Sequence, residues 1–187
     1  MKRAIVVGSA SCLFRDLKAI EKLVERDTFA EIIGVNRAAM VVPVHRWASL
    51  HPELFFRDRG GAGWLEERRE FFPEATPVLY GPSSKPRADV VPIETAGRGS
   101  SGYFGVELAL ELGAERILLV GIPMTPTPHV LESEPWDAAN AHFKVWQEPE
   151  TLERFRNVRS VSGRTAELLG TPSREWWRGL TNGDARA

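Results

Sequence analysis

The sequence predicts an α/β fold of three layers, in which a mostly parallel sheet is covered by helices on both faces. Short apolar runs rich in β-branched residues alternate along the chain with longer segments whose apolar residues recur at helical spacing. The short runs are apolar throughout, as strands are when both faces of a parallel sheet are covered. Alternation of such strands with helices is typical of α/β proteins.

The first strand and helix set the pattern for the rest of the chain. Residues 3–7 (RAIVV) are expected to form a strand, and the segment after Gly8 carries Leu13, Leu17 and Ile20 at helical spacing. Further strands are expected at 31–35, 45–50, 77–80 and 116–120, with weaker candidates at 88–93 and 157–161. Helices are expected over roughly the twenty residues after Pro52, with a glycine-rich break at 59–63, after Ser100-Ser101-Gly102, and at 136–156 and 162–170.

The helix after Gly102 is read as amphipathic. Val106, Ala109 and Leu110 share one face, and Glu107 and Glu111 lie on the other.

Length and composition favour a single domain spanning residues 1–187. A chain of 187 residues with 43% apolar content can fill one core, and a second domain would be hard to fit. The last ten residues, 178–187, are expected to be a frayed end. Most of the six tryptophans should lie in the core or in an interface, because large aromatic side chains bury the most area.

Charge and cysteine content restrict the partners and the compartment. The chain has 24 basic and 25 acidic residues and a net charge of -1, so neither nucleic acid nor an anionic membrane is expected as a partner. The single cysteine, Cys12, cannot form an intrachain disulfide. Neither a signal peptide nor an apolar run long enough to cross a membrane is found, and we therefore expect a cytoplasmic protein.

The segments that follow the expected strands are rich in glycine, serine and hydrogen-bonding side chains. Ligands of parallel sheets bind at the carboxyl ends of the strands. These ends are residues 8–11, 36–37, 51–53, 81–84 and 121–124, the last of which begins with Gly121.

Two of these sites combine small residues with a helix start. Gly8, Ser9 and Ser11 lie between the first strand and its helix, and Ser100-Ser101-Gly102 opens a later helix. Helix starts present free N–H groups and a positive dipole end to an anion, and glycine lets the backbone approach a ligand. The alternative is that the serines only cap their helices.

Asn36 and Arg37 follow the second strand. The amide of Asn36 suits a base edge or a sugar hydroxyl, and the guanidinium of Arg37 suits a phosphate. An asparagine that only forms a turn is the alternative for Asn36.

Two histidines are candidates for a general base. His129 lies in a proline-stiffened loop, and His51 follows a strand and is held in extended geometry by Pro52. We expect structural roles for His45 and His142.

Two further segments could contact the ligand. Residues 81–99 are proline-rich and glycine-rich and are the candidate lid. Gly97-Arg98-Gly99 is either its hinge, with a cation at the centre, or a loop with a solvated arginine. Ser162-Gly163, another Ser-Gly helix start with arginines on either side, is either a third anion contact or a cap.

The absent motifs restrict the chemistry. The sequence has no C-x-x-C, H-E-x-x-H or D-x-D spacing, no complete glycine-rich phosphate loop and no G-x-S-x-G motif. We therefore expect a metal-independent site with no cofactor other than a nucleotide-type ligand.

The order of motifs resembles a known superfamily. Three segments occur in this order: AIVVGSASCL, IIGVNRA and GSSGYFGVELALELGAERILLVGIPM. Their pattern is similar to that of metal-independent bacterial sialyltransferases and of the archaeal 6-hydroxymethylpterin diphosphokinase-like (MptE-like) family. Short phage and prophage proteins look similar too. The resemblance covers about the first two thirds of the chain and implies a Rossmann-like three-layer sandwich. Ser9-Ala10-Ser11 replaces the usual glycine and proline of the first loop, and Pro123-Met124 replaces a common acidic residue.

The resemblance implies a nucleotide or nucleotide-sugar as ligand. By motif match the pocket would be lined by Gly8, Ser9, Ser11, Asn36, Ser100, Ser101 and Gly102, with His129 as the base. The leading hypothesis is a metal-independent, glycosyltransferase-like transferase. The alternatives are a non-catalytic nucleotide-binding or sequestering protein, working as a homo-oligomer through exposed tryptophans, and an ATP-dependent diphosphokinase.

Overall fold

The structure, a computed structural model, describes residues 2–24, 30–56, 63–94 and 99–179. Its strands are β1 (Arg3–Val7), β2 (Glu31–Val35), β3 (Arg46–Ala48), β4 (Val78–Pro82), β5 (Val91–Ile93), β6 (Arg116–Val120) and β7 (Val158–Ser160). Its helices are α1 (Leu13–Val24), α2 (Ala38–Val41), α3 (Trp64–Phe71), α4 (Ser101–Glu111), α5 (Ala139–Trp146), α6 (Pro149–Arg154), α7 (Gly163–Leu169), α8 (Arg174–Arg178) and the 3-10 helix η1 (Pro52–Phe55).

The strands form one sheet with the order β5-β4-β3-β2-β1-β6-β7. Every pairing between neighbouring strands of the described part is parallel. The chain builds one half of the sheet outward from β1 to β5 and then returns to place β6 on the other side of β1. The α/β fold is therefore confirmed, and its strand order reverses between β1 and β6, where open α/β sheets place their ligands.

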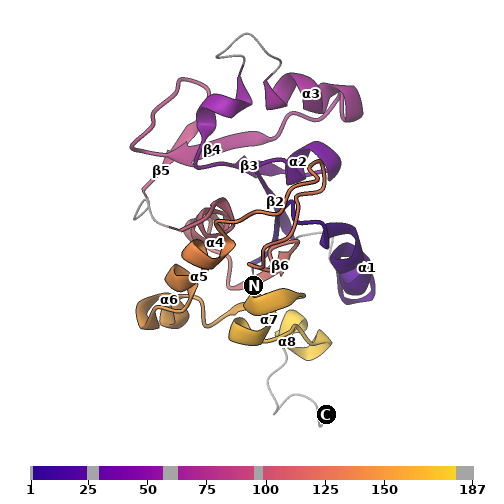
Figure 1. Cartoon of the computed structure of the whole chain (residues 1–187), viewed down its shortest axis with the longest axis vertical. Helices are drawn as coiled ribbons and strands as arrows, with labels where there is room; N and C mark the ends of the chain where they lie inside the picture. Colours follow the sequence, from indigo (N-terminus) through magenta and orange to yellow (C-terminus); the bar gives the residue numbers. More distant parts are fainter. Residues whose placement is uncertain (1, 25–29, 57–62, 95–98, 180–187) are drawn as a thin grey trace.

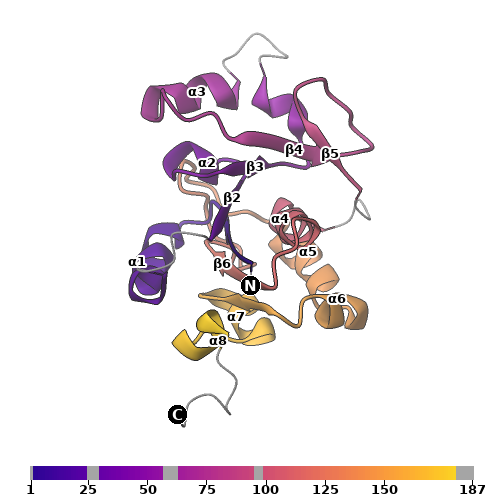
Figure 2. The same ribbon diagram turned by 180° about the vertical axis from the view of Figure 1, so that it is seen from behind.

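Helices cover both faces of the sheet and enclose two cores (Figures 1 and 2). The core under α4, α5 and α6 includes Val6, Phe104 and Trp146. The core on the opposite face, under α1 and α2, includes Val7 and Trp47. Val6 and Val7 are neighbours in β1 but face opposite cores, because successive side chains of a strand point to opposite faces.

The element boundaries differ from the sequence prediction in several places. The helix expected at 136–156 is two helices, because Pro149 lacks the N–H that a continuous helix needs and instead begins α6. The short helices α2 and α8 were not predicted, since four or five residues carry too little periodicity, and η1 lies at the start of the helical region expected after Pro52. Arg178, assigned to the frayed end, closes α8, and residues 180–187 lie outside the described part.

The two-faced reading of α4 is wrong. Glu107, expected on the polar face, is 2% exposed, and its Oε1 accepts a hydrogen bond from Arg154 Nη1 of α6 at 2.7 Å. The side of α4 opposite the sheet is covered by α6, which local periodicity does not reveal.

None of the six tryptophans is fully exposed. Trp47, Trp146 and Trp177 are fully buried, and the other three are partly buried. The oligomer expected through exposed tryptophans stays a prediction. No helix within the described ranges is long and apolar enough to cross a membrane.

Candidate functional site

A cavity of about 400 Å³ opens at the carboxyl ends of the strands, beside the reversal of strand order between β1 and β6. All of the predicted site residues except Ser11 and Arg37 line it. They are Gly8, Ser9, Asn36, His51, Ser100, Ser101, Gly102, Gly121 and His129.

The floor of the cavity is a close contact between two strand ends. The Gly8 N–H donates to the Val120 carbonyl oxygen at 2.8 Å. A Cβ on Gly8 would fall on the Gly121 carbonyl, and one on Gly121 would fall on the Gly8 carbonyl. Gly121 also has a φ of +65°, which favours glycine. Both glycines are required for the backbones to touch, whether or not a ligand binds.

One wall is the segment 123–136, which we call the strap. It leaves β6 and crosses the loop between β1 and α1. The Val130 N–H donates to the Ser9 carbonyl at 2.7 Å, and the Ser11 N–H donates to the Pro128 carbonyl at 2.8 Å. Between these two bonds, Ser9 Oγ lies 2.9 Å from His129 Nδ1. The strap therefore places the predicted base against the predicted ligand loop.

An aromatic face continues this wall. The Trp136 ring lies 5.9 Å from the His129 ring and stacks on His142 with centroids 5.4 Å apart. The expected packing role of His142 holds, but Trp136 and His142 also line the cavity. The sequence did not reveal this, because nothing in the local pattern shows which face of α5 borders the cavity.

Another wall contains the N-terminus of α4. Ser100 Oγ accepts a hydrogen bond from the Tyr103 N–H at 3.4 Å, so Ser100 does cap the helix. The first bond of the helical pattern runs from the Phe104 N–H to the Ser100 carbonyl at 3.0 Å. The N–H groups of Ser101 and Gly102 precede it and have no partner within the helix. Capping and ligand binding are thus compatible at this helix start.

Asn36 and His51 lie at the ends of β2 and β3. Asn36 has a left-handed φ of +49°, and its Oδ1 accepts from Ser49 Oγ at 2.9 Å. The same Ser49 Oγ accepts from the His51 N–H at 2.9 Å. The turn role of Asn36 is therefore present in a residue that also lines the cavity. The imidazole of His51 is turned toward Glu53, with Nδ1 3.3 Å from Oε1.

The ionisable side chains of the lining are basic. The lining contains one charged side chain, Lys85, and three imidazoles, those of His51, His129 and His142, and none of the described residues that line the cavity is Asp or Glu. Lys85 Nζ donates to the Leu50 carbonyl at 2.8 Å, which holds it near His51. Such a lining favours an anionic ligand. Of the proposed hinge, Gly99 lines the cavity, while Gly97 and Arg98 lie outside the described residues.

Three predicted anion contacts lie elsewhere. Ser11 lines a neighbouring hollow of about 310 Å³ with Arg15, and this hollow shares part of the strap with the cavity. Arg37 is turned to the strap, with Nη1 3.5 Å from Glu132 Oε1. The Ser162 hydroxyl donates a hydrogen bond to Asp16 Oδ2 at 2.5 Å, so its donor is used by a carboxylate within the protein.

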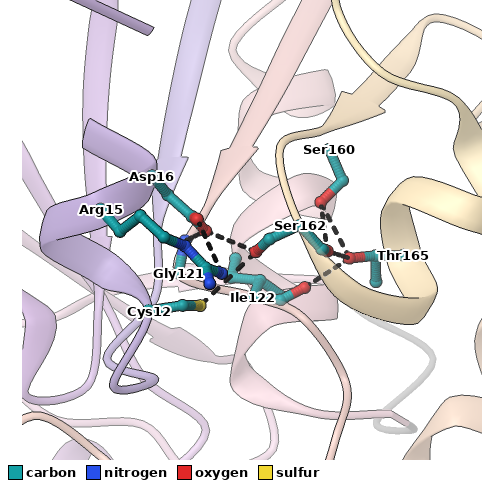
Figure 3. Close-up of polar contacts among 8 residues, drawn as sticks. All are labelled: Cys12, Arg15, Asp16, Gly121, Ile122, Ser160, Ser162 and Thr165. Atoms are coloured by element: carbon teal, nitrogen blue, oxygen red, sulfur yellow. Dashed lines mark hydrogen bonds and ion pairs between the residues drawn. The ribbon is translucent and has the colours of Figure 1, made fainter. Parts of the chain in front are cut away.

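Asp16 is the residue that sequence reasoning missed (Figure 3). It is 1% exposed, and its Oδ2 accepts both the Ser162 hydroxyl and the Gly121 N–H, the latter at 3.1 Å. The carboxylate thereby ties α1 to the turn after β6. A signal was present, because Asp16 shares its helical face with Leu13 and Ile20 and so falls among buried positions.

Two neighbours complete this cluster (Figure 3). Thr165 Oγ1 donates to the Ile122 carbonyl at 2.6 Å, which holds the same turn from α7. Cys12 Sγ lies 3.5 Å from Ser162 Oγ. Burial raises the pKa of the Cys12 thiol above its ordinary value; the hydrogen bond with Ser162 opposes this shift, and the Asp16 charge adds to it.

No family model matches the chain, and no curated protein matches it either. Within the described part of the chain, no group of three or more His, Cys, Asp or Glu side chains is arranged to hold a metal ion.

Proposed function

We propose that this protein binds a nucleotide or nucleotide-sugar in the cavity and transfers a group from it without a metal ion. The observation that carries the proposal is the lining of the cavity. It contains one lysine and three histidines, and none of the described residues that line it carries a carboxylate. These side chains surround a helix start at the reversal of strand order. Phosphate groups are anions that bind well to helix N-termini and to basic side chains. The resemblance of the motifs to nucleotide-sugar transferases supports the same ligand class.

The cavity size agrees with this ligand class. Its volume of about 400 Å³ falls in the range of about 300 to 1,000 Å³ that small-molecule sites occupy. Trp136 offers a flat apolar face for a base or sugar ring, and the α4 N-terminus offers N–H groups for a phosphate. The two kinds of surface correspond to the two chemical parts of a nucleotide.

His129 is the proposed general base. An imidazole can accept a proton from a hydroxyl near neutral pH. His129 is held by the strap at the cavity wall, whereas His51 faces Glu53 at the rim. We assign the proton transfer to His129 and an electrostatic contribution to His51. Transfer would depend on positioning and on the helix-end electrostatics of α4.

A non-catalytic binding protein is the second candidate. The hydrogen bond between His129 and Ser9 favours it, because a histidine that only fastens the strap would make the same contact. The two candidates differ in what becomes of the ligand, which is returned cleaved by a transferase and intact by a binding protein.

Thermal-shift and calorimetric titrations with nucleoside mono-, di- and triphosphates and nucleotide-sugars test the proposal, followed by mass spectrometry of the ligand. We expect a stabilising nucleotide whose binding weakens about tenfold or more in Lys85→Ala, as loss of a charged contact implies. Lys144→Ala, which changes an exposed lysine outside the cavity, is the matched control and should bind normally. Absence of binding to every nucleotide tested would overturn the proposal, and a requirement for magnesium would favour diphosphate transfer instead.

A further inference from the structure

The Ser9 hydroxyl and the His129 imidazole form a pair that the proposed function does not fully use. Their side chains lie 2.9 Å apart although the residues are 120 positions apart in sequence. Both residues line the cavity, and Ser9 is 7% exposed. A serine hydroxyl within about 2.6 to 3.2 Å of a histidine nitrogen is the arrangement in which serine acts as a nucleophile.

The backbone holds this pair in place without help from the side chains. The bonds from Val130 N–H to the Ser9 carbonyl and from Ser11 N–H to the Pro128 carbonyl lie on either side of it. Ala10 and His129 form an antiparallel bridge between the same segments. These backbone contacts fix the positions of Ser9 and His129 independently of the bond between their side chains.

The surroundings suit a reaction that builds negative charge. The side chain of Ile122 packs against the backbone of Gly8 on one side and of Gly102 on the other, so the loop that carries Ser9 lies close to the start of α4. The N–H groups of Ser101 and Gly102 have no partner within that helix. They are donors of the kind that stabilise a charged transition state.

We propose that Ser9 is a covalent nucleophile and that His129 is its base, so that transfer occurs at a phosphorus atom of the ligand through a Ser9 phosphoester. This inference rests on the proposed function for the ligand class and specifies the bond that is broken. In this proposal His129 first accepts the proton of the Ser9 hydroxyl, because Ser9 Oγ lies within hydrogen-bond distance of His129 Nδ1.

The reaction has two balanced steps. In the first, Ser9 Oγ bonds to phosphorus, the bond from phosphorus to the leaving oxygen breaks, and the Ser9 proton passes to His129 Nδ1 and then to the leaving group. In the second, an acceptor hydroxyl or water gives its proton to His129, its oxygen bonds to phosphorus, and the bond to Ser9 Oγ breaks. The proton then returns from His129 to Ser9.

A fluorophosphonate probe tests the proposal without knowledge of the natural ligand. Its phosphorus is electrophilic and loses fluoride when serine attacks. We expect one adduct on the intact wild-type protein, and fragmentation of the tryptic peptide 4–15 should place it on Ser9 and not on Ser11. Ser11→Ala is the matched control and should be labelled normally, whereas Ser9→Ala should not be labelled.

His129→Gln separates a base from a structural partner, because glutamine can still hydrogen-bond to Ser9 but cannot take its proton. We expect its labelling rate to fall about 100-fold, within the range of general base catalysis, with circular dichroism unchanged. His45→Gln, which alters a histidine outside the cavity, should label at the wild-type rate.

The outcomes separate this inference from the proposed function. Binding of a nucleotide by a protein whose Ser9 is never labelled would overturn the covalent step and leave the proposed function standing. Equal labelling of wild type and His129→Gln would overturn the role of His129 as base. Labelling of Ser9 in a protein that binds no nucleotide would support the pair as a nucleophile and overturn the ligand class.

Discussion

Substitution of Asp16 by asparagine is expected to destabilise the fold and loosen the floor of the cavity. Asp16 Oδ2 accepts the Gly121 N–H at 3.1 Å and the Ser162 hydroxyl at 2.5 Å, and the side chain is 1% exposed. Each hydrogen bond to a buried charged group contributes about 1.5 to 3 kcal/mol. The amide oxygen of asparagine can still face both donors but carries no charge, and its NH₂ group replaces Oδ1, which faces the Arg15 guanidinium. Two charge-assisted hydrogen bonds thereby become neutral ones, and the free energy of unfolding should fall by about 2 kcal/mol.

Urea unfolding followed by fluorescence measures this change, with the slope of the transition checked for equality between variants. Ser162→Ala removes one of the two donors and should cost about 1 to 2 kcal/mol. Arg15→Ala is the surface control, because the Arg15 side chain is 74% exposed and its ion pair with Asp16 should contribute about 0 to 1 kcal/mol.

A double-mutant cycle of Asp16→Asn and Ser162→Ala should show coupling of about 1 kcal/mol or more, since the two groups share a hydrogen bond. A loss below about 1 kcal/mol for Asp16→Asn would refute the argument that this carboxylate anchors the turn after β6. Equal losses for Asp16→Asn and Arg15→Ala would refute it as well.

Three further predictions follow from individual residues. Gly121→Ala should lower the free energy of unfolding in urea by about 3 kcal/mol or more, because φ at this position is +65° and the new Cβ would meet the Gly8 carbonyl. A loss below about 1 kcal/mol would show that the two strand ends can separate with little strain. Arg68 is 1% exposed, and among the described residues its Nε and Nη2 have no hydrogen-bond partner. Arg68→Met should therefore leave the free energy of unfolding in urea unchanged or raise it. A fall of more than about 1 kcal/mol would contradict this prediction. The raised pKa of Cys12 means that less thiolate is present at a given pH, and the thiolate is the form that iodoacetamide modifies. Iodoacetamide at about pH 7.5 should therefore modify Cys12 more slowly in the folded protein than in urea, and faster in Asp16→Asn than in wild type. Equal rates in all three samples would argue against the raised pKa.

Local signals in the sequence were enough to predict the longer strands and helices and the edge of the sheet at which the candidate site lies. β1, α1, β2, α4 and β6 follow from apolar runs and helical spacing. The parallel-sheet rule alone brings Gly8, Asn36 and Gly121 to one edge, because strands that run in the same direction end on the same side. Short or compound elements such as α2, α8 and the division between α5 and α6 exceed what periodicity can resolve.

Contacts among these residues depend on the three-dimensional packing of the chain. Ser9 and His129 are brought together by the strap crossing the β1 loop, and Lys85 and His142 join the cavity from elements that carry no motif. The same packing buries Glu107 beneath α6 and directs Asp16 to the turn after β6. Local patterns reflect which face of an element is covered, whereas contacts between distant residues depend on the order in which strands pair and on where each crossover lies. The strand ends that line the candidate site are therefore readable from the chain, whereas the side chains that reach it from other elements follow from the packing.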